Sequence, residues 1–162
     1  MFTLNEGDCR SAFDSSGDLW EGSTANSLTE WTKPQLARTG SALPSPKVEI
    51  TSYVNGPCKP VFDRAGDLWG PNLKNVVEYT KAQLAKSGST TPKVIISSSS
   101  LSSPIDAAFD GPGDLWVPNQ GNDTVVEFTK AQLTKSASVA PARTISGPAT
   151  GLNYPIDVAI EP

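Results

Sequence analysis

The sequence contains no histidine in 162 residues, and only one methionine and two cysteines. Without histidine the chain can form neither Ser/His or Cys/His nucleophile pairs nor an imidazole zinc site, and it lacks the simplest acid–base group for neutral pH. Any catalysis would have to use carboxylates, lysine, tyrosine or a metal held by oxygen ligands. No apolar run approaches the roughly 20 residues that span a bilayer, so we expect no membrane segment.

The balance of charge excludes a second class of partner. Lys and Arg number 13 against 17 Asp and Glu, which gives a formal net charge of -4. Nucleic-acid phosphates are neutralised by broad cationic surfaces, so we expect no nucleic-acid binding. The opening residues, MFTLNEGDCRSAF, lack the basic region and apolar core of a signal peptide. As written, the chain is expected to be soluble, to carry no export signal and to form one domain.

Internal repetition is the dominant feature of the sequence. The motif F-D-x-x-G-D-L-W occurs at 13–20, 62–69 and 109–116, and each copy is followed by T-K-x-Q-L. The tryptophans that end the three copies of F-D-x-x-G-D-L-W are 49 and then 47 residues apart. This period matches a four-stranded propeller blade and exceeds that of ankyrin or tetratricopeptide units.

Each repeat has the pattern of four short strands joined by turns. In the third repeat PIDAAFD ends in an Asp-x-x-Gly hairpin corner, DLWV continues as a second strand, and TVVEF supplies a third. T-K-x-Q has the form of a capping box, which predicts a short capped helix before the fourth strand. The expected fold is therefore all-β, with about three propeller blades of four antiparallel strands. The blades are predicted over approximately 8–51, 57–97 and 104–146, with a partial inner strand at 155–160.

Aromatic residues recur at fixed places in the predicted strands. A blade must bury both faces against its neighbours, so these side chains are expected in the core between blades rather than as ligand-stacking platforms. They are Trp20, Trp69, Trp116, Trp31, Tyr79 and Phe128.

The pattern P-x-D-x-A-F-D-x-x-G-D-L-W-V-x-N, followed by N-x-T-V-V-E-F-T, resembles the NHL-type repeat of six-bladed β-propellers over nearly the whole chain. The T-K-A-Q-L continuation is similar to that of secreted bacterial propellers described as NHL-repeat or gluconolactonase-like proteins. Members of this family range from scaffolds and ligand binders to lactonases and lyases. The branch that resembles virginiamycin B lyase depends on histidine, and no lactonase ligand set matches here residue by residue. The resemblance therefore implies no catalytic residue in this chain.

Three blades do not close a propeller, which typically has 4 to 8. A second copy can complete a six-bladed ring around a twofold axis as a homodimer, which would hide the open edges. Alternatively, the sequence is part of a longer propeller. Surplus pieces at 1–4 and 154–162 favour this second interpretation, because each would compete with its equivalent in a partner copy.

Candidate ligand-binding residues lie around the expected channel and on the loops of one face. The aligned positions at the start of the inner strands are Arg10, Lys59, Asp106 and Asp157. This mixed-charge ring can hold a small polar or sugar-like ligand, but we favour the alternative that it forms interblade salt bridges and backbone caps. The loops of the same face add Asn72, Asn119, Asn122 and Tyr154, although asparagine also satisfies turn backbone.

Two further features have structural interpretations. The corner aspartates suit calcium, but each corner supplies only two carboxylates and no twelve-residue loop with a final glutamate follows, so we expect turn chemistry and no metal or other cofactor.

Cys9 and Cys58 occupy the same position in consecutive repeats. Two buried thiols are preferred to a disulfide there, because inner strands of adjacent blades lie near the limit of bridging distance.

Two functions remain open at this point. The first is a non-catalytic propeller module, for binding or as a scaffold, that presents loops to a protein, a glycan or a small polar molecule. The absence of histidine and the regularity of the repeats favour it. The alternative is a metal-dependent, lactonase-like hydrolase that uses the channel carboxylates Asp106 and Asp157.

Overall fold

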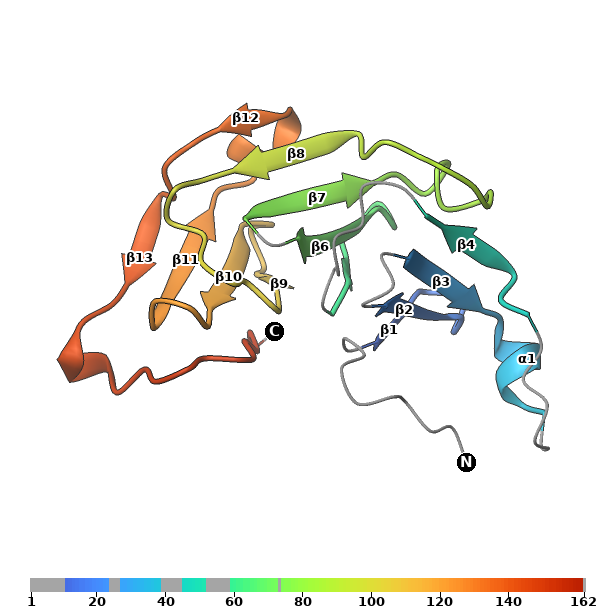
Figure 1. Ribbon diagram of the computed structural model, residues 1–162, viewed down its shortest axis with the longest axis horizontal. Helices are drawn as coiled ribbons and strands as arrows, with labels where there is room; N and C mark the ends of the chain where they lie inside the picture. The colour runs from blue at the N-terminus through green and yellow to red at the C-terminus, as the bar shows by residue number, and fades with distance from the viewer. Residues whose placement is uncertain (1–10, 24–26, 39–44, 52–58, 73, 162) are drawn as a thin grey trace.

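The computed structural model describes residues 11–23, 27–38, 45–51, 59–72 and 74–161. These residues form three β-sheets that follow one another along an arc (Figure 1). The outer strands lie along the convex side of the arc, and the inner strands β1 and β9 lie toward the concave side, to which the C-terminal segment returns. The predicted all-β propeller arrangement is confirmed for this part of the chain.

Each sheet is built mainly from one repeat. The first contains β1 (Ser11–Phe13), β2 (Leu19–Ser23), β3 (Ser27–Trp31) and β4 (Val48–Ile50). The second contains β5 (Val61–Phe62), β6 (Leu68–Asn72), β7 (Asn75–Tyr79), β8 (Val94–Ser97) and, from the third repeat, β12 (Ala137–Ser138). The third contains β9 (Ala108–Phe109), β10 (Leu115–Asn119), β11 (Thr124–Phe128) and β13 (Arg143–Ile145). Within each repeat, sequential strands pair antiparallel.

The predicted capped helix occurs in three different forms. The first T-K-x-Q-L copy begins α1 (Lys33–Leu36), the third contains the 3-10 turn η1 (Gln132–Thr134), and the second forms turns over 81–85. A further 3-10 turn, η2 (Pro148–Thr150), follows the third sheet. All are single turns, and none of the helices in the described ranges is long and apolar enough to cross a membrane.

The repeated glutamine of this motif fastens the turn at both ends. In each copy its Oε1 accepts a hydrogen bond from the backbone N of the preceding threonine at 2.8–2.9 Å. Its Nε2 donates to a carbonyl oxygen ahead of the fourth strand at 2.7–2.9 Å. One side chain thus satisfies groups on both sides of a loop, which explains why Gln35, Gln83 and Gln132 recur whether or not a regular helix forms.

Aromatic pairs join consecutive sheets. The rings of Trp20 and Phe62 meet edge to face at 6.3 Å, and those of Trp69 and Phe109 repeat the contact at 6.0 Å. Trp20 and Trp69 are 2% and 3% exposed, and Tyr79 and Phe128 are fully buried, as predicted for the core.

Two of the predicted core aromatics are less buried than expected. Trp116 and Trp31 are only partly buried. For Trp116 the reason is its place in the third sheet, because the described residues contain no following sheet to supply a phenylalanine against it.

Backbone hydrogen bonds also join consecutive sheets. Gly88 N donates to Glu49 O at 2.9 Å, and Val139 N donates to Ser97 O at the same distance, so each repeat adds a short parallel contact to the outer strand before it. Gly88 therefore makes a contact between consecutive repeats. The outer strand β13 has no such cover among the described residues, and all three of its residues are exposed.

The predicted inner strand at 155–160 is wrong, because these residues form no strand. An inner strand is defined by its ladder with a second strand, and none of the described residues supplies that ladder here. The segment is instead held by Val158 N, which donates to Asp106 Oδ2 at 2.9 Å. It lies beside the third sheet, as a fourth inner strand would.

Candidate functional site

The predicted ring exists for three of its four positions. Lys59 Nζ lies 3.0 Å from Asp106 Oδ2 and 2.8 Å from Asp157 Oδ1, although the three residues are up to 98 positions apart in sequence. Lys59 and Asp106 each precede an inner strand, and inner strands line the axis of a propeller. Asp157 is brought to them by its neighbour Val158, whose backbone N donates to Asp106 Oδ2. Arg10 lies outside the described residues, as do Cys9 and Cys58.

Asp106 is the centre of this group. It is 0% exposed, and its oxygens also accept hydrogen bonds from the backbone N–H groups of Ala107 at 2.8 Å and Val158 at 2.9 Å. Burial, followed by its hydrogen bond with Asp157, raises the pKa of Asp106 against the lowering effect of the backbone donors and Lys59. Burial disfavours the Lys59 ammonium, but hydrogen bonds to Asp157 and Asp106 outweigh this and raise the pKa of Lys59.

The four loop candidates have different environments. Asn119 is fully buried, with Oδ1 accepting from Ser102 N at 3.1 Å and Nδ2 donating to Ser100 O and Thr124 Oγ1. It ties the loop before β9 to the β10–β11 hairpin. Asn72 is also buried, at the end of β6. Asn122 and Tyr154 are exposed, and Tyr154 is positioned by its backbone N, which donates to Asp123 Oδ1 at 2.8 Å. Of these side chains, Asn122 and Tyr154 are the accessible ones.

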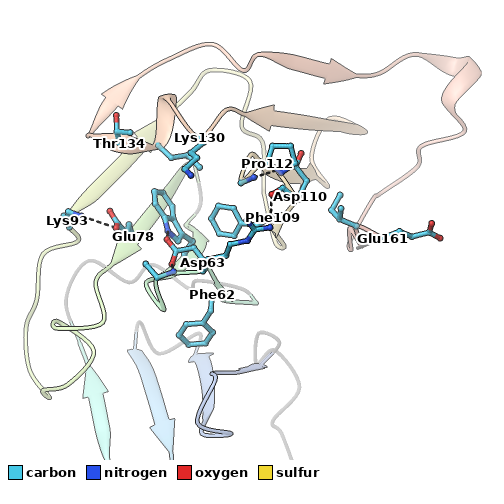
Figure 2. Close-up of a pocket in the computed structure, with 17 residues that line it drawn as sticks. Phe62, Asp63, Glu78, Lys93, Phe109, Asp110, Pro112, Lys130, Thr134 and Glu161 are labelled. Carbon is cyan, nitrogen blue, oxygen red and sulfur yellow. Dashed lines mark hydrogen bonds and ion pairs between the residues drawn. The ribbon is translucent and has the colours of Figure 1, made fainter.

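A groove of about 770 Å³ lies between the second and third sheets, away from the ring residues (Figure 2). Its walls include Phe62, Trp69 and Phe109, and its rim includes Arg64 and Lys130. Arg64 reaches from the corner of the second sheet to the corner of the third, where its guanidinium donates to Gly111 O at 2.9 Å. In an antiparallel sheet the first–second and third–fourth connections share one end, so this groove opens on the face opposite the loops predicted to bind ligand.

No motif of the sequence predicted this groove. The same arrangement occurs between the first and second sheets, where its volume is only about 360 Å³. The third corner has Gly111 at the position that Arg64 occupies in the second corner and Ser15 in the first. The larger groove therefore has no side chain at the place where Arg64 lines the smaller groove. The glycine at this repeat position was the feature of the sequence from which a wider groove could have been predicted.

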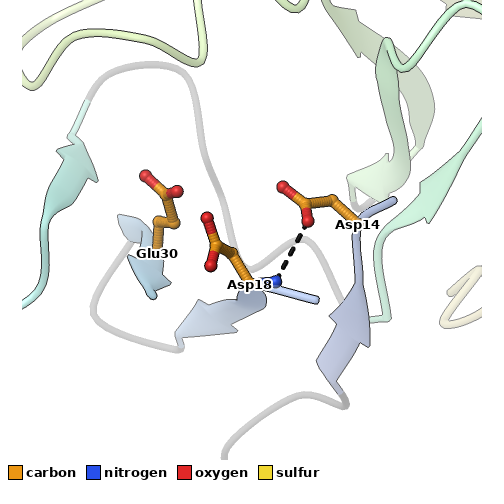
Figure 3. Close-up of side chains that lie close together, drawn as sticks. All are labelled: Asp14, Asp18 and Glu30. Atoms are coloured by element: carbon orange, nitrogen blue, oxygen red, sulfur yellow. Dashed lines mark hydrogen bonds between the residues drawn. The ribbon is translucent and has the colours of Figure 1, made fainter. Parts of the chain in front are cut away.

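Carboxylates gather at the first and third corners of the same face. Asp14, Asp18 and Glu30 lie with carboxylate oxygens within 4.8 Å of one another (Figure 3). An equivalent group is formed by Asp110, Asp114 and Glu127. The third carboxylate of each group comes from the third strand, a partner that was not predicted.

Each corner carboxylate already has a structural task. Asp14 Oδ1 accepts from Ser16 N and Asp18 N at 2.8 and 3.0 Å, while its Oδ2 accepts from Trp20 Nε1 at 3.3 Å. Asp18 Oδ1 accepts from Lys33 N at 2.7 Å, and Glu30 pairs with Lys47 Nζ at 3.0 Å. The predicted turn chemistry is therefore present at these corners.

The third-strand glutamates are buried beside these aspartates. Burial is the main cause that raises the pKa of Glu30, Glu78 and Glu127, and the partner cations Lys47, Lys93 and Arg143 act in the opposite direction. For Asp110, burial is outweighed by donors that include Trp116 and two backbone N–H groups, which lower its pKa. Burial thus disfavours the charge of these glutamates, whereas hydrogen-bond donors favour the charge of Asp110.

The geometry is similar to that of several solved structures. Virginiamycin B lyase from Staphylococcus aureus matches with a TM-score of 0.55 and 12% identity over 80% of this chain and 40% of that chain. A streptogramin B lyase matches with a TM-score of 0.53 and 15% identity, over 81% and 40%. The extracellular domain of BT4673 from B. thetaiotaomicron matches with a TM-score of 0.57 and 18% identity, over 86% and 19%.

The sequence itself matches no protein-family profile. No curated protein matches it either. At the identities of the structural neighbours, likeness shows the fold alone. The chain spans 40% or less of the length of these neighbours. It therefore has the fold of a partial β-propeller.

Proposed function

We propose that this chain is a non-catalytic β-propeller module of the NHL-like type that presents its ring-side loops to a protein, a glycan or a small polar molecule. The observation that carries the proposal is the position of Lys59, whose ammonium bridges the ring carboxylates at 3.0 and 2.8 Å. A divalent ion at those oxygens would have to displace a cation already in place. The exposed side chains of Asn122 and Tyr154 remain accessible for recognition on this face.

The hydrolase alternative is supported less well. Its candidate acids are the same Asp106 and Asp157, and Asp106 is committed to two backbone N–H groups as well as to Lys59. Lyase chemistry is reported in the names of two structural neighbours, but the family resemblance ties that chemistry to histidine, which this chain lacks. Neither activity is therefore proposed here.

A thermal-shift screen with Ca²⁺, Mg²⁺, Mn²⁺ and Zn²⁺ separates the two functions, because an ion that binds only the native state raises the melting temperature. We expect no saturable shift. A saturable shift that disappears in Asp106→Asn would contradict the non-catalytic proposal. The matched control is Asp123→Asn, which removes an exposed carboxylate outside the ring.

We also propose that a second copy covers the open edges of the arc. Phe13 is 63% exposed, whereas its counterparts Phe62 and Phe109 pack on the tryptophan of the sheet before them. Trp116 has no such cover among the described residues, and Ile145 is 44% exposed where Ile50 and Ile96 are fully buried. The two ends are therefore complementary halves of a contact that occurs twice inside the chain.

Light scattering coupled to size exclusion tests this assembly. We expect twice the 17.1 kDa of one chain, and a shift toward the single mass in Phe13→Ala. In this arrangement residues 155–161 would compete with the partner's β1, so Asp157→Ala, which removes the contact of this segment with Lys59, should favour the dimer. A mass of one chain at every concentration would overturn this proposal.

A further inference from the structure

The groove between the second and third sheets has the size of a small-molecule site. Its volume of about 770 Å³ lies within the range of roughly 300–1,000 Å³ that is usual for ligand pockets. It is lined by side chains from the corners of both sheets, from the turn after β11 and, in the C-terminal segment, from Ile160 and Glu161 (Figure 2). None of the ring residues Lys59, Asp106 and Asp157 belongs to it.

The floor and one wall of the groove are aromatic. Trp69 is 3% exposed and holds its ring in place through Nε1, which donates to Asp63 Oδ2 at 3.2 Å. Phe109 packs edge to face on Trp69, and both Phe109 and Phe62 are only partly buried. Rigid ring surfaces of this kind pack against the C–H face of a flat, partly apolar ligand.

The charges on the rim are of two kinds. Asp63, Asp110 and Glu78 are held by backbone, indole or lysine donors, so their negative charge is at least partly compensated. Arg64 and Lys130 are exposed and form no ion pair with any described residue. The rim thus offers two cations that pair with no described carboxylate, and it also carries the exposed carboxylate of Glu161. The carboxylate oxygens of the rim can accept further hydrogen bonds.

We propose that this groove binds a carboxylated sugar of the hexuronate class, of monosaccharide to disaccharide size. The ligand carboxylate pairs with the Arg64 guanidinium and the Lys130 ammonium, and its ring lies against Phe109. Its hydroxyls donate to the rim carboxylates. A neutral sugar lacks the anion, and an aromatic carboxylate lacks the hydroxyl donors, so the mixed rim fits a hexuronate better than either.

The neighbouring groove provides an internal comparison. It has Lys81 at the position equivalent to Lys130, but the Arg64 side chain stands where the larger groove has Gly111, and its volume is about 360 Å³. A Cβ added at Gly111 would meet no atom within 4 Å. Gly111→Arg therefore gives the larger groove the side chain of the smaller one while leaving the backbone undisturbed.

Calorimetric titration with digalacturonate tests the proposal on the full chain. We expect saturable binding that Gly111→Arg abolishes and that Arg64→Gln and Lys130→Gln each weaken by about tenfold, as expected for the loss of one charge-assisted hydrogen bond. Lys81→Gln, in the smaller groove, should bind as the wild type does. Circular dichroism checks that each variant is folded. If Gly111→Arg does not fold, Arg64→Gln still tests the proposal.

Neutral galactobiose and phenylacetate are the matched ligand controls. Galactobiose lacks the carboxylate that pairs with the cations, and phenylacetate lacks the hydroxyls that donate to the rim carboxylates. Each should therefore bind at least tenfold more weakly than digalacturonate. The proposal is overturned by absence of digalacturonate binding, by equal binding of galactobiose, or by binding that survives Gly111→Arg. Equal binding of phenylacetate would overturn the sugar assignment. Because Arg64 and Lys130 lie outside the ring, none of these outcomes depends on the function proposed for the opposite face.

Discussion

Replacing Lys59 by methionine removes the ammonium from the ring and keeps most of the apolar side chain. Asp106, which is 0% exposed, is then left with two backbone N–H donors and no cation. Breaking a buried ion pair by removing one partner costs about 3–5 kcal/mol. Because Lys59 keeps 29% of its side chain exposed and Asp106 retains its backbone donors, we expect a loss of about 2–3 kcal/mol in the free energy of unfolding.

Asp157→Asn is the matched control, because it removes the exposed half of the same network. The Asp157 side chain is 52% exposed, so its pair with Lys59 is screened by solvent and its loss should cost only about 0.5 kcal/mol. Urea unfolding of both variants and the wild type at pH 7 measures the difference. Equal losses would refute the view that Asp106 is the centre of the ring.

The pH dependence gives a second, independent check. Burial already raises the pKa of Asp106, and loss of the Lys59 charge should raise it further. A carboxyl whose folded pKa is raised binds its proton more strongly when folded, so its contribution is present at low pH and is lost as pH rises through the folded pKa. The gap in stability between Lys59→Met and wild type should therefore narrow from pH 7 to pH 4. A gap that widens would contradict this reasoning.

Three further changes test other parts of the molecule. Gln83→Ala removes a side chain that bonds Thr80 N and Thr91 O, and should lower the unfolding free energy by about 1–2 kcal/mol in urea titrations. Glu78 has a pKa raised above 4.5 mainly by burial, so its contribution falls as pH rises through the folded value. Melting temperatures of Glu78→Gln relative to wild type should consequently improve from pH 4 to pH 7. Asp14→Ala, which frees two backbone N–H groups and Trp20 Nε1, should destabilise by about 1–3 kcal/mol, and an unchanged melting temperature would contradict its role as a corner cap.

The repeats made the fold predictable because they carry local and long-range signals together. F-D-x-x-G-D-L-W contains a corner whose aspartate bonds the turn backbone, followed by a strand whose tryptophan packs toward the next sheet. The ring could also be predicted, since aligned positions in successive blades lie around one axis. Lys59, Asp106 and Asp157 were found by that alignment alone.

The groove could not be predicted by the same reasoning. Its shape depends on how two sheets sit against each other, and the residues that enlarge or charge it are those that differ between copies. Gly111 and Arg64 stand at one repeat position, yet one leaves space and the other spans it. Alignment of the repeats draws attention to the positions that are the same in every copy and away from residues of this kind. In a repeat protein, the positions at which the copies differ are therefore the better indicators of a specific site.

The third sheet shows which part of burial belongs to a repeat and which to its neighbours. Leu115, Val117 and Phe128 are fully buried, as their counterparts in the second sheet nearly are, so contacts within a blade and with the blade before it are complete. Trp116 and Ile145 have the same repeat positions as buried residues but remain accessible. In a chain of repeats, stability is the sum of intrinsic terms and nearest-neighbour interfaces, and an end repeat lacks one interface. The exposed surfaces of the third sheet therefore indicate what a following blade would bury. They are the ring of Trp116, the side chain of Ile145 and the outer edge of β13.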